Sequence, residues 1–562
     1  MNKELVKSLK KPLKEISVKL KDNEIKNLIE IPPSSAMGDF AFPCFSLSRQ
    51  LKKSPAQIAS ELKRRIIKLP KGFDKIDIYG GYVNFFLDRK RFAENLVKEI
   101  LEKKNKFGQK KINLKGMIEF SQPNTHKAFH IGHIRGTSLG ESLARIAEFF
   151  GEKVVRANYS GDTGMHIAKW IWCYKKYHSK KKLKDDEEWI ASIYVDAVKR
   201  LSKNEKFQEE VDEINRKIED KSDKKINELW KKTRKLSINS WKKIYNELDT
   251  KFDVHYFESE FEKRGREIAK ELLKKKIAKI SDSATIIDLG NLGIWILLRK
   301  DGTVLYSAKD LALAEKKSSS YNLDWNIYVI ANEQDLHMKQ LLKTMELMRI
   351  KDRKKIHHVS YGVVRLPTGK MSSRTGDNIL YSDFINDVSD YAKKRIKERL
   401  AKISKKELEE RALVVSIAAI KYSMLKQNPK RNIIFVKENA LNFEGDTGPY
   451  LLYSYARANS ILKKANSNQK IFSIHKLGPT EFKLIRKLSQ FPEVVLDTYD
   501  SFNPALIANY SHELAKIFNE FYHACPILHS QQKSFRLKLV ESFKIILGRS
   551  LYLLGIETLD EM

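Results

Sequence analysis

The sequence has few cysteines and no long apolar run, and each shortage excludes a class of protein. Only Cys44, Cys173 and Cys525 occur among 562 residues, far apart and without a CxxC pair. This excludes a disulfide framework and a CxxC zinc site, so we expect three buried thiols in a reducing, cytoplasmic setting. No segment approaches the roughly 18 apolar residues of a membrane helix. The opening MNKELVKSLKKPLKEI lacks the apolar core of a secretion signal.

What the sequence has in excess is basic charge. Lysine and arginine number 106 against 71 aspartates and glutamates, which gives a formal net charge of +35. Such an imbalance predicts a polyanionic partner, with nucleic acid as the first choice. A proteome biased towards lysine is the alternative, because lysine runs occur almost everywhere in the chain. Hydrophobic residues make up 42% of the chain, which is enough for folded cores.

Patterns along the chain predict a multidomain α/β protein. Residues 1–110 combine helix patterns with two strands about a Gly-Gly turn, which indicates a small α+β domain. Residues 111–385 alternate strands and helices, as in a Rossmann-type parallel sheet, and are interrupted at about 166–280 by a helical insertion with solvated faces. Residues 386–562 carry four or more amphipathic helices and predict an all-α bundle.

The segment KGMIEFSQPNTHKAFHIGHIRGT, at 115–137, predicts a strand, a turn and the start of a helix. Apolar residues then recur on one helix face at Leu139, Leu143, Ile146 and Phe150, and Gly151 stands where a helix C-terminal glycine would. A second apolar run follows, so the segment forms a βαβ unit. Its first turn lies at the carboxyl edge of the sheet, where ligands bind in such folds.

The residues of this turn suit a phosphate ligand. Helix amides and the helix dipole favour negative charge, and Gly132 lets a ligand approach the backbone closely. The imidazoles of His130 and His133 can donate to phosphate oxygens, with Asn124 and Lys127 on the approach. The chemistry that fits is attack by a carboxylate on an α-phosphate, which needs positioning and charge stabilisation. Two histidines that only cap a helix remain the alternative.

A second motif, LPTGKMSSRTGD at 366–377, places Lys370 at the tip of a glycine-punctuated polar loop. A mobile loop with one lysine suits a pyrophosphate whose charge develops only in the transition state. In isolation the loop reads as ordinary solvated surface. Its occurrence together with the histidine turn favours a nucleotide site.

HIGH on a βα turn followed by KMSS resembles the class I aminoacyl-tRNA synthetases. The surrounding segments are similar to arginyl-tRNA synthetases in particular. These segments are EFSQPNTHKAFHIGHIRGT, NYSGDTGMH, VLYSAKDLALA, YVIANEQDLHM, FEGDTGPYLLYSYARANSIL, PALIANYSHELAKIFNEFYHACPIL and LYLLGIETLDEM, with GDFAFPCFSLSRQLKKSPAQIA near the N-terminus. The resemblance covers nearly the whole chain and is weakest in the helical insertion.

The resemblance implies ATP-dependent ligation of L-arginine to tRNA(Arg) through an arginyl-adenylate, with release of pyrophosphate and AMP. It implies Mg²⁺ with the ATP and no zinc. Catalytic roles fall on His130, His133, Lys127 and Lys370, and ATP contacts on His130, Gly132, His133, Lys370 and Ser372. The resemblance assigns binding of the arginine substrate to Glu119, Asn124, Tyr306, Asp310 and Gln334. A guanidinium with five donors in a planar fork suits two carboxylates, and lysine would not fill both.

Some positions depart from the family pattern. Gln122 stands where a second serine is common, and Lys309 replaces an arginine at a sheet end. In the KMSS loop, Ser373 and Thr375 stand where lysines are common. Because Lys127 compensates in members that lack the loop lysines, the division of work between Lys127 and Lys370 is left open.

The resemblance also implies RNA contacts for both terminal domains. The bundle would grip the anticodon arm and the N-terminal domain the tRNA elbow. Tyr450, Tyr453 and Tyr455 near Arg457 suit stacking on unpaired bases, although tyrosines at this spacing are equally ordinary core residues. We expect a monomer with no membrane contact. The alternatives are a cysteinyl-tRNA synthetase, which would need cysteine ligands for zinc, and a catalytically inactive RNA-binding relative.

Overall fold

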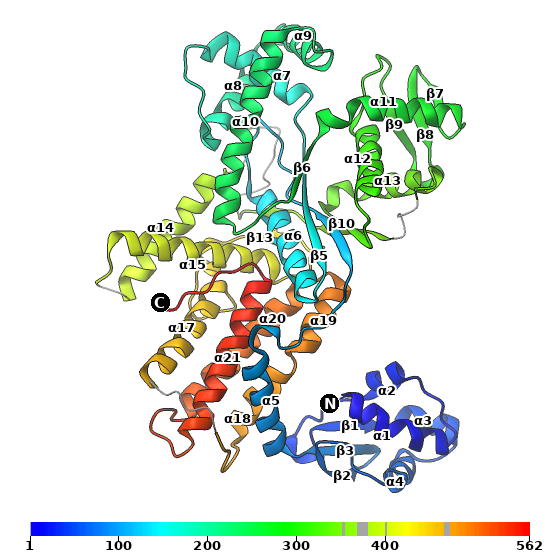
Figure 1. Cartoon of the computed structure of the whole chain (residues 1–562), viewed down its shortest axis with the longest axis vertical. Coiled ribbons are helices and arrows are strands. Elements are labelled where there is room, and N and C mark those ends of the chain that lie inside the picture. The colour runs from blue at the N-terminus through cyan, green and yellow to red at the C-terminus, as the bar shows by residue number, and fades with distance from the viewer. Residues whose placement is uncertain (1, 351–354, 368–379, 400–401, 466–471) are drawn as a thin grey trace. The chain divides into compact units, whose positions relative to one another are not determined.

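The computed structural model (Figure 1) describes residues 2–350, 355–367, 380–399, 402–465 and 472–562. The chain forms two compact units. The first contains residues 1–104, 467–489 and 520–542, and the second contains residues 105–466, 490–519 and 543–562.

The first unit contains the small α+β domain that the sequence predicts. Its antiparallel sheet has the order β1-β3-β2, and β2 meets β3 at the Gly-Gly turn. Ser54 caps a helix that begins at Pro55, because its hydroxyl accepts from the backbone N–H of Gln57. The elements are α1 (Asn2–Glu15), α2 (Asp22–Leu28), β1 (Phe40–Pro43), α3 (Phe45–Leu51), α4 (Pro55–Arg65), β2 (Phe73–Tyr79), β3 (Tyr82–Leu87), α5 (Arg89–Lys103) and α18 (Pro479–Ser489).

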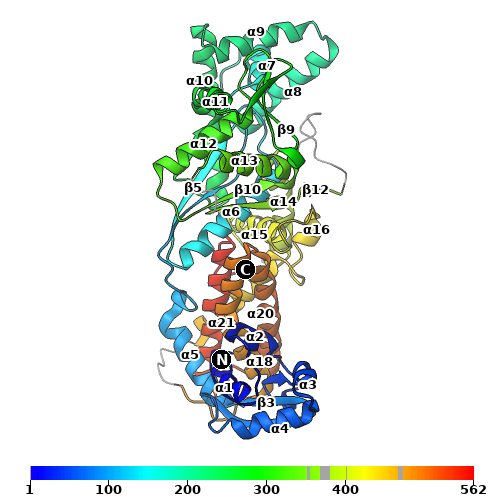
Figure 2. The same cartoon turned by 90° about the vertical axis from the view of Figure 1, so that its right-hand side faces the viewer.

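The second unit is built on a five-stranded parallel sheet with the order β11-β10-β4-β5-β6. Its strands are β4 (Lys115–Glu119), β5 (Lys153–Ser160), β6 (Val254–Phe257), β10 (Trp325–Ala331) and β11 (Ile356–Tyr361). Helix α6 (Ile131–Phe149) packs against β4, β5 and β10 (Figure 2). The predicted Rossmann-type sheet is confirmed.

Helices on the other side of this sheet form a core with Met117, Ala157 and Tyr328. They are α11 (Glu258–Lys274), α12 (Tyr306–Ser320) and α13 (Asp335–Leu347), together with a small sheet of β7 (Lys279–Ser281), β8 (Ala284–Asp288) and β9 (Ile294–Leu298). Side chains alternate along a strand. Phe120 therefore lies against Gly140 of α6, whereas Glu119 faces α12, where Lys317 lies.

The helical insertion is confirmed, but it ends earlier than about residue 280. It consists of α7 (Met165–Cys173), a π-helical turn (Tyr174–His178), α8 (Glu187–Lys203), α9 (Phe207–Glu219) and α10 (Lys224–Glu247). Strand β6 lies within the predicted range and pairs in parallel with β5, so the main sheet resumes at Val254. A four-residue strand between charged helices gives too short an apolar run to stand out.

The faces of the insertion are also less solvated than its charge suggests. Trp170, Trp172 and Trp230 form a core inside it. Trp241 and Tyr245 of α10 are buried as well.

The C-terminal part is helical as predicted. Its elements are α14 (Tyr381–Arg399), α15 (Lys405–Leu425), α16 (Lys437–Ala440), α17 (Gly448–Ala465), α19 (Phe491–Ser501), α20 (Ala505–Ala524) and α21 (Lys533–Leu553), with a two-residue bridge between β12 (Val364–Arg365) and β13 (Ile433–Ile434). None of the described helices is long and apolar enough to cross a membrane. Cys44 and Cys173 are buried, but Cys525 is only half-buried, contrary to the prediction.

Candidate active site

The strand order creates a crevice at the carboxyl end of β4. The chain crosses from one side of β4 to the other between β6 and β10, and open α/β sheets bind ligands at such a switch point. Glu119 is the last residue of β4 and lies opposite Tyr328 of β10. The connection from β4 to α6 therefore leaves the sheet at this crevice.

A cavity of about 440 Å³ opens there. The five residues predicted to hold arginine all line it, although they come from three separate stretches of sequence. The lining consists of Glu119, Gln122, Asn124, Tyr159, Gly161, Glu258, Tyr306, Asp310, Leu313, Tyr328, Ile330, Glu333, Gln334, His337, Met338 and Leu341. Four carboxylates in one lining indicate a cationic ligand.

Glu119 is held rigidly at the base of this cavity. Its side chain is 2% exposed, and its Oε2 forms an ion pair with the buried ammonium of Lys317 from α12. Burial disfavours that ammonium, but the attraction of Glu119 outweighs it and raises the pKa of Lys317. The other oxygen, Oε1, accepts from the Gln122 amide at 2.9 Å. Gln122, which departs from the family pattern, thus orients a carboxylate of the cavity.

Asp310 is fixed by a chain of hydrogen bonds through His337. The indole N–H of Trp295 donates to His337 Nδ1 at 3.3 Å, and His337 Nε2 lies 2.6 Å from Asp310 Oδ2. Because Nδ1 accepts, Nε2 carries the proton and donates to the carboxylate. The ring of Tyr306 lies 4.7 Å from the His337 ring, so one histidine supports two of the predicted substrate residues.

The far wall of the cavity depends on a close approach at Gly161. A Cβ at this position would lie 2.3 Å from Asn124 Oδ1 and 3.1 Å from Glu258 Oε1, so only glycine fits. Lys309 Nζ lies 3.5 Å from Glu258 Oε2 and 3.0 Å from the Thr163 hydroxyl. Lys309 therefore keeps the charge of the arginine that the family pattern has there.

The imidazoles of His130 and His133 cap the N-terminus of α6 by accepting from backbone N–H groups of its first turn. His130 Nδ1 accepts from the Gly132 N–H at 3.2 Å, and His133 Nδ1 accepts from the His130 N–H at 3.1 Å. The rings stack with centroids 3.9 Å apart. Since both Nδ1 atoms accept, the protons reside on Nε2, and each ring presents one outward donor.

Both imidazoles are neutral near pH 7. Burial, followed by the nearby charge of Lys127, lowers the pKa of His130 to about 4. Burial lowers the pKa of His133 well below its usual value, with further contributions from His130 and Lys127. Helix capping and phosphate binding are thus compatible, because capping uses Nδ1 and leaves Nε2–H.

Positive charge beside this turn comes from Lys127. Burial and then the neighbouring Lys169 lower the pKa of Lys127, while Glu258 opposes the shift. Its ammonium lies 5.6 Å from the centroid of the Tyr194 ring. Lys370 and Ser372, with Ser373 and Thr375, lie outside the described residues.

The connection between Glu119 and α6 is strained and is fastened by the insertion. Ser121, Gln122 and His126 have φ values of 78°, 52° and 64°, a region that non-glycine residues avoid. Helix α10 holds this conformation through hydrogen bonds from three side chains. The Tyr245 hydroxyl lies 2.8 Å from Ser121 Oγ, Ser237 Oγ accepts from the His126 N–H at 3.0 Å, and Thr233 Oγ1 lies 2.7 Å from His126 Nε2.

Several residues of the cavity were not identified from the sequence. Lys317, His337, Tyr159 and Glu258 surround the predicted residues in space. Tyr159 and His337 lie inside the segments NYSGDTGMH and YVIANEQDLHM, so proximity to these motifs could have indicated them. Lys317 sits in a lysine-rich stretch and gives no signal of its own.

The tyrosines proposed for base stacking make contacts within the bundle. Tyr453 and Arg457 interact, with the Arg457 guanidinium 3.0 Å from the Tyr453 hydroxyl. Asn519 of α20 donates to the Tyr450 hydroxyl at 2.8 Å. The described contacts of these residues are those of packing within the bundle.

Comparison with known proteins gives a consistent result along the chain. The family model for the catalytic domain of class I (R) tRNA synthetases matches residues 96–436. The DALR anticodon binding domain matches residues 451–562, and the arginyl tRNA synthetase N terminal domain matches residues 3–87.

Whole proteins agree with the domain matches. The arginine–tRNA ligase of Clostridium acetobutylicum is 37% identical and covers 98% of this chain and 100% of its own length. That of Clostridium perfringens is 35% identical, covering 97% and 98%. The structure of Thermus thermophilus arginyl-tRNA synthetase is 25% identical and superposes with a TM-score of 0.82 over the full length of both chains. The chain therefore belongs to the arginyl-tRNA synthetase family, in class I of the aminoacyl-tRNA synthetases.

Proposed function

We propose that this chain ligates L-arginine to tRNA(Arg) at the expense of ATP. The observation that carries the proposal is the single cavity that joins Glu119, Asn124, Tyr306, Asp310 and Gln334 at the switch point of the sheet. Its carboxylates suit the guanidinium and ammonium groups of arginine. The capped histidine turn lies on the same β4–α6 connection, which supports a phosphate site beside the amino-acid site.

In the first step, a carboxylate oxygen of arginine attacks the α-phosphorus of ATP. An O–P bond forms to give arginyl-adenylate, the bond to pyrophosphate breaks, and pyrophosphate leaves with the electron pair. In the second step, a ribose hydroxyl of the tRNA attacks the acyl carbon, and AMP leaves. The protein contributes mainly by positioning the groups and by stabilising charge at the phosphates.

We assign the phosphate contacts to the histidine turn. His130 and His133 donate through Nε2, and the N-terminus of α6 adds its dipole. Because both rings are neutral, positive charge must come from elsewhere, and we assign it to Lys127 and Lys370. Gly132 lets the nucleotide approach the backbone, and Ser372 adds a contact from the KMSS loop. Mg²⁺ would accompany the ATP, held largely by phosphates and water.

No zinc is assigned to the protein. The described residues contain one group with metal-binding donors close together, Cys173, His178 and Asp196. Asp196 Oδ2 lies 2.9 Å from Arg200 Nε and 2.8 Å from His178 Nε2. The guanidinium of Arg200 thus already occupies the carboxylate oxygen that the group would offer to a metal, which does not fit a zinc site.

We assign tRNA contacts to residues 1–110 and 386–562, the α+β and helical domains proposed at the two ends of the chain. A net charge of +35 supports a polyanionic partner. We further propose that the protein acts as a monomer in the cytoplasm.

The test is ATP–pyrophosphate exchange with each of the twenty amino acids, with and without tRNA, followed by aminoacylation. Of the twenty amino acids, only arginine should support exchange. A variant with both His130→Ala and His133→Ala should lose about 10²-fold or more of the rate, the effect typical of losing a transition-state donor. If the protein binds tRNA but supports no exchange with any amino acid, it is a catalytically inactive RNA-binding relative.

A further inference from the structure

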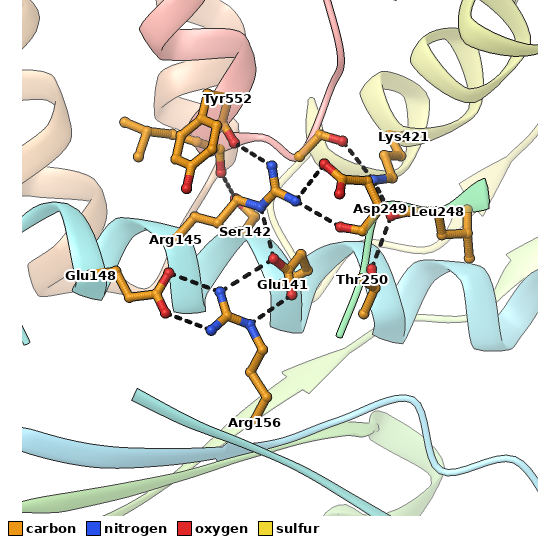
Figure 3. Close-up of polar contacts among 12 residues, drawn as sticks. Glu141, Ser142, Arg145, Glu148, Arg156, Leu248, Asp249, Thr250, Lys421 and Tyr552 are labelled. Atoms are coloured by element: carbon orange, nitrogen blue, oxygen red, sulfur yellow. Dashed lines mark hydrogen bonds and ion pairs between the residues drawn. The ribbon is translucent and has the colours of Figure 1, made fainter. Parts of the chain in front are cut away.

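A buried ionic cluster occupies the end of α6 that lies away from the histidine turn (Figure 3). Glu141 is shared by two guanidinium groups, with Arg145 Nε at 2.7 Å and Arg156 Nε at 2.9 Å from its two oxygens. Arg156 also forms a two-pronged pair with Glu148 at 2.5 and 2.9 Å. The side chains of Arg145 and Glu141 are only 8% and 5% exposed, so these charges depend on one another.

Arg145 extends beyond this cluster to the end of helix α21. Its Nη1 donates to the Tyr552 carbonyl at 3.2 Å, and its guanidinium carbon lies 4.9 Å from the centroid of the Tyr552 ring. Its Nη2 donates to the carbonyl and carboxylate of Asp249 at 2.7 and 2.8 Å. Segments around Arg145, Asp249 and Tyr552, which are far apart in the chain, thus meet at the Arg145 side chain.

Two further contacts reinforce this junction. Ser142 of α6 donates to the Leu553 carbonyl at 2.8 Å. Lys421 of α15 is fully buried and donates to the carbonyls of Leu248 and Gly555, each at 2.6 Å. Gly555 has φ +69°, and a Cβ there would lie 3.2 Å from Lys421 Nζ, so the turn requires glycine.

Residues 552–555 are here called the C-terminal turn. The carbonyls contacted there belong to a helix end, which leaves its last carbonyls without intrahelical partners. Cations stabilise this negative end of the helix dipole. Side chains of α6, which begins at the histidine turn and is here called the histidine helix, therefore replace water at the end of α21. Arg145 lies 12 residues beyond His133, or about 18 Å along a continuous helix. Protein interiors are close-packed and transmit strain. A shift of the C-terminal turn would therefore move α6 as a whole.

We propose that Arg145 is a positioning residue that ties the C-terminal turn to the histidine helix, so that the helical bundle sets the placement of His130 and His133. The proposal rests on the proposed function, in which the bundle binds tRNA. It assigns a specific contact through which the RNA-binding part and the catalytic part of this unit act together.

The test compares Arg145→Lys with Arg156→Gln in the full-length enzyme. Lysine keeps the charge beside Glu141 but cannot hold Asp249 and Tyr552 simultaneously. Arg156 belongs to the same cluster, but the hydrogen bonds described for its side chain go to Glu141 and Glu148, so its variant controls for damage to the cluster. Adenylate formation, the KM values for ATP and arginine, and tRNA affinity are measured for both variants and for the wild type.

We expect Arg145→Lys to lower kcat for adenylate formation by about 10-fold or more, because small misplacements of reacting groups have large effects on rate. KM for arginine and tRNA affinity should change by less than about threefold, since those sites are untouched. Arg156→Gln should stay within about threefold of the wild type in kcat. Ser142→Ala, which removes only the bond to Leu553, should show a smaller loss of the same kind and serves if Arg145→Lys folds poorly.

Equal losses of kcat in Arg145→Lys and Arg156→Gln would overturn the proposal, because the cluster would then serve stability alone. An unchanged kcat in both Arg145→Lys and Ser142→Ala would overturn it as well. A wild-type enzyme that neither activates arginine nor binds tRNA would instead refute the proposed function, so the two failures are distinguishable.

Discussion

The ion pair between Glu119 and Lys317 offers a quantitative test of how the arginine cavity is built. Both side chains are almost fully buried, at 2% and 1% exposure. Lys317→Met keeps the length of the side chain but removes its charge. Glu119 would then remain buried with one hydrogen bond from Gln122. Breaking a buried pair in this way costs about 3–5 kcal/mol.

The expected change in thermal stability follows from this energy. A change of 1 kcal/mol shifts the unfolding midpoint by about 2–4 °C in a unit of 150–250 residues, and by less in a larger one. The second unit is larger, so we expect Lys317→Met to lower its midpoint by about 3–6 °C. Scanning calorimetry of the ligand-free protein measures this shift. Lys316→Met, on the exposed side of the same helix, is the matched control and should change stability by less than about 0.5 kcal/mol.

The double variant decides whether the loss comes from the uncompensated charge. Adding Glu119→Gln to Lys317→Met removes that charge, so the double variant should recover part of the lost midpoint. If the two single losses simply add in the double variant, Glu119 and Lys317 do not depend on each other, and the reasoning fails. The reasoning would also fail if Lys317→Met unfolded at the wild-type temperature.

Four further predictions concern specificity, pH, strain and the two lysines. Asp310→Asn should weaken arginine recognition by about 2–5 kcal/mol, measured as kcat/KM, because the guanidinium loses half of a charged pair in a desolvated cavity; an unchanged KM and kcat would remove Asp310 from the site. The pKa of His130 is lowered from 6.5 to about 4, so between these values the unfolded chain binds more protons, and this contribution to stability is complete above pH 6.5 and is lost as pH falls towards 4; unfolding midpoints of the wild type and His130→Gln should converge over that range. Ser237→Ala removes the acceptor of a buried N–H in the strained connection and should lower kcat for exchange between about 10- and 100-fold, with little change in tRNA affinity; a wild-type kcat would mean that the turn holds itself. Lys127→Ala should raise KM for ATP more than it lowers kcat, whereas Lys370→Ala should do the reverse, and a double loss that equals the product of the two single losses would show that the lysines act independently.

The sequence by itself determined the domain classes and identified five residues that line the cavity. Periodicity located the βαβ unit, and the glycine at position 151, with φ +80°, does end α6. Motif matches gave five cavity residues because each lies in a short segment of fixed local chemistry. The capping role of the histidines was also open to prediction, since it depends only on residues three positions apart.

Only the tertiary structure decided how those residues are held. Lys317 lies 198 positions from Glu119, and Tyr245 lies 124 positions from Ser121. No local pattern selects one lysine from a lysine-rich helix, because the choice depends on which helix packs over the end of β4. The end of the insertion was misplaced for the same reason, since β6 is defined by its pairing with β5 rather than by its own four residues. Local periodicity and turn chemistry are properties of neighbouring residues, whereas the partners of a buried charge are fixed only when distant elements pack together.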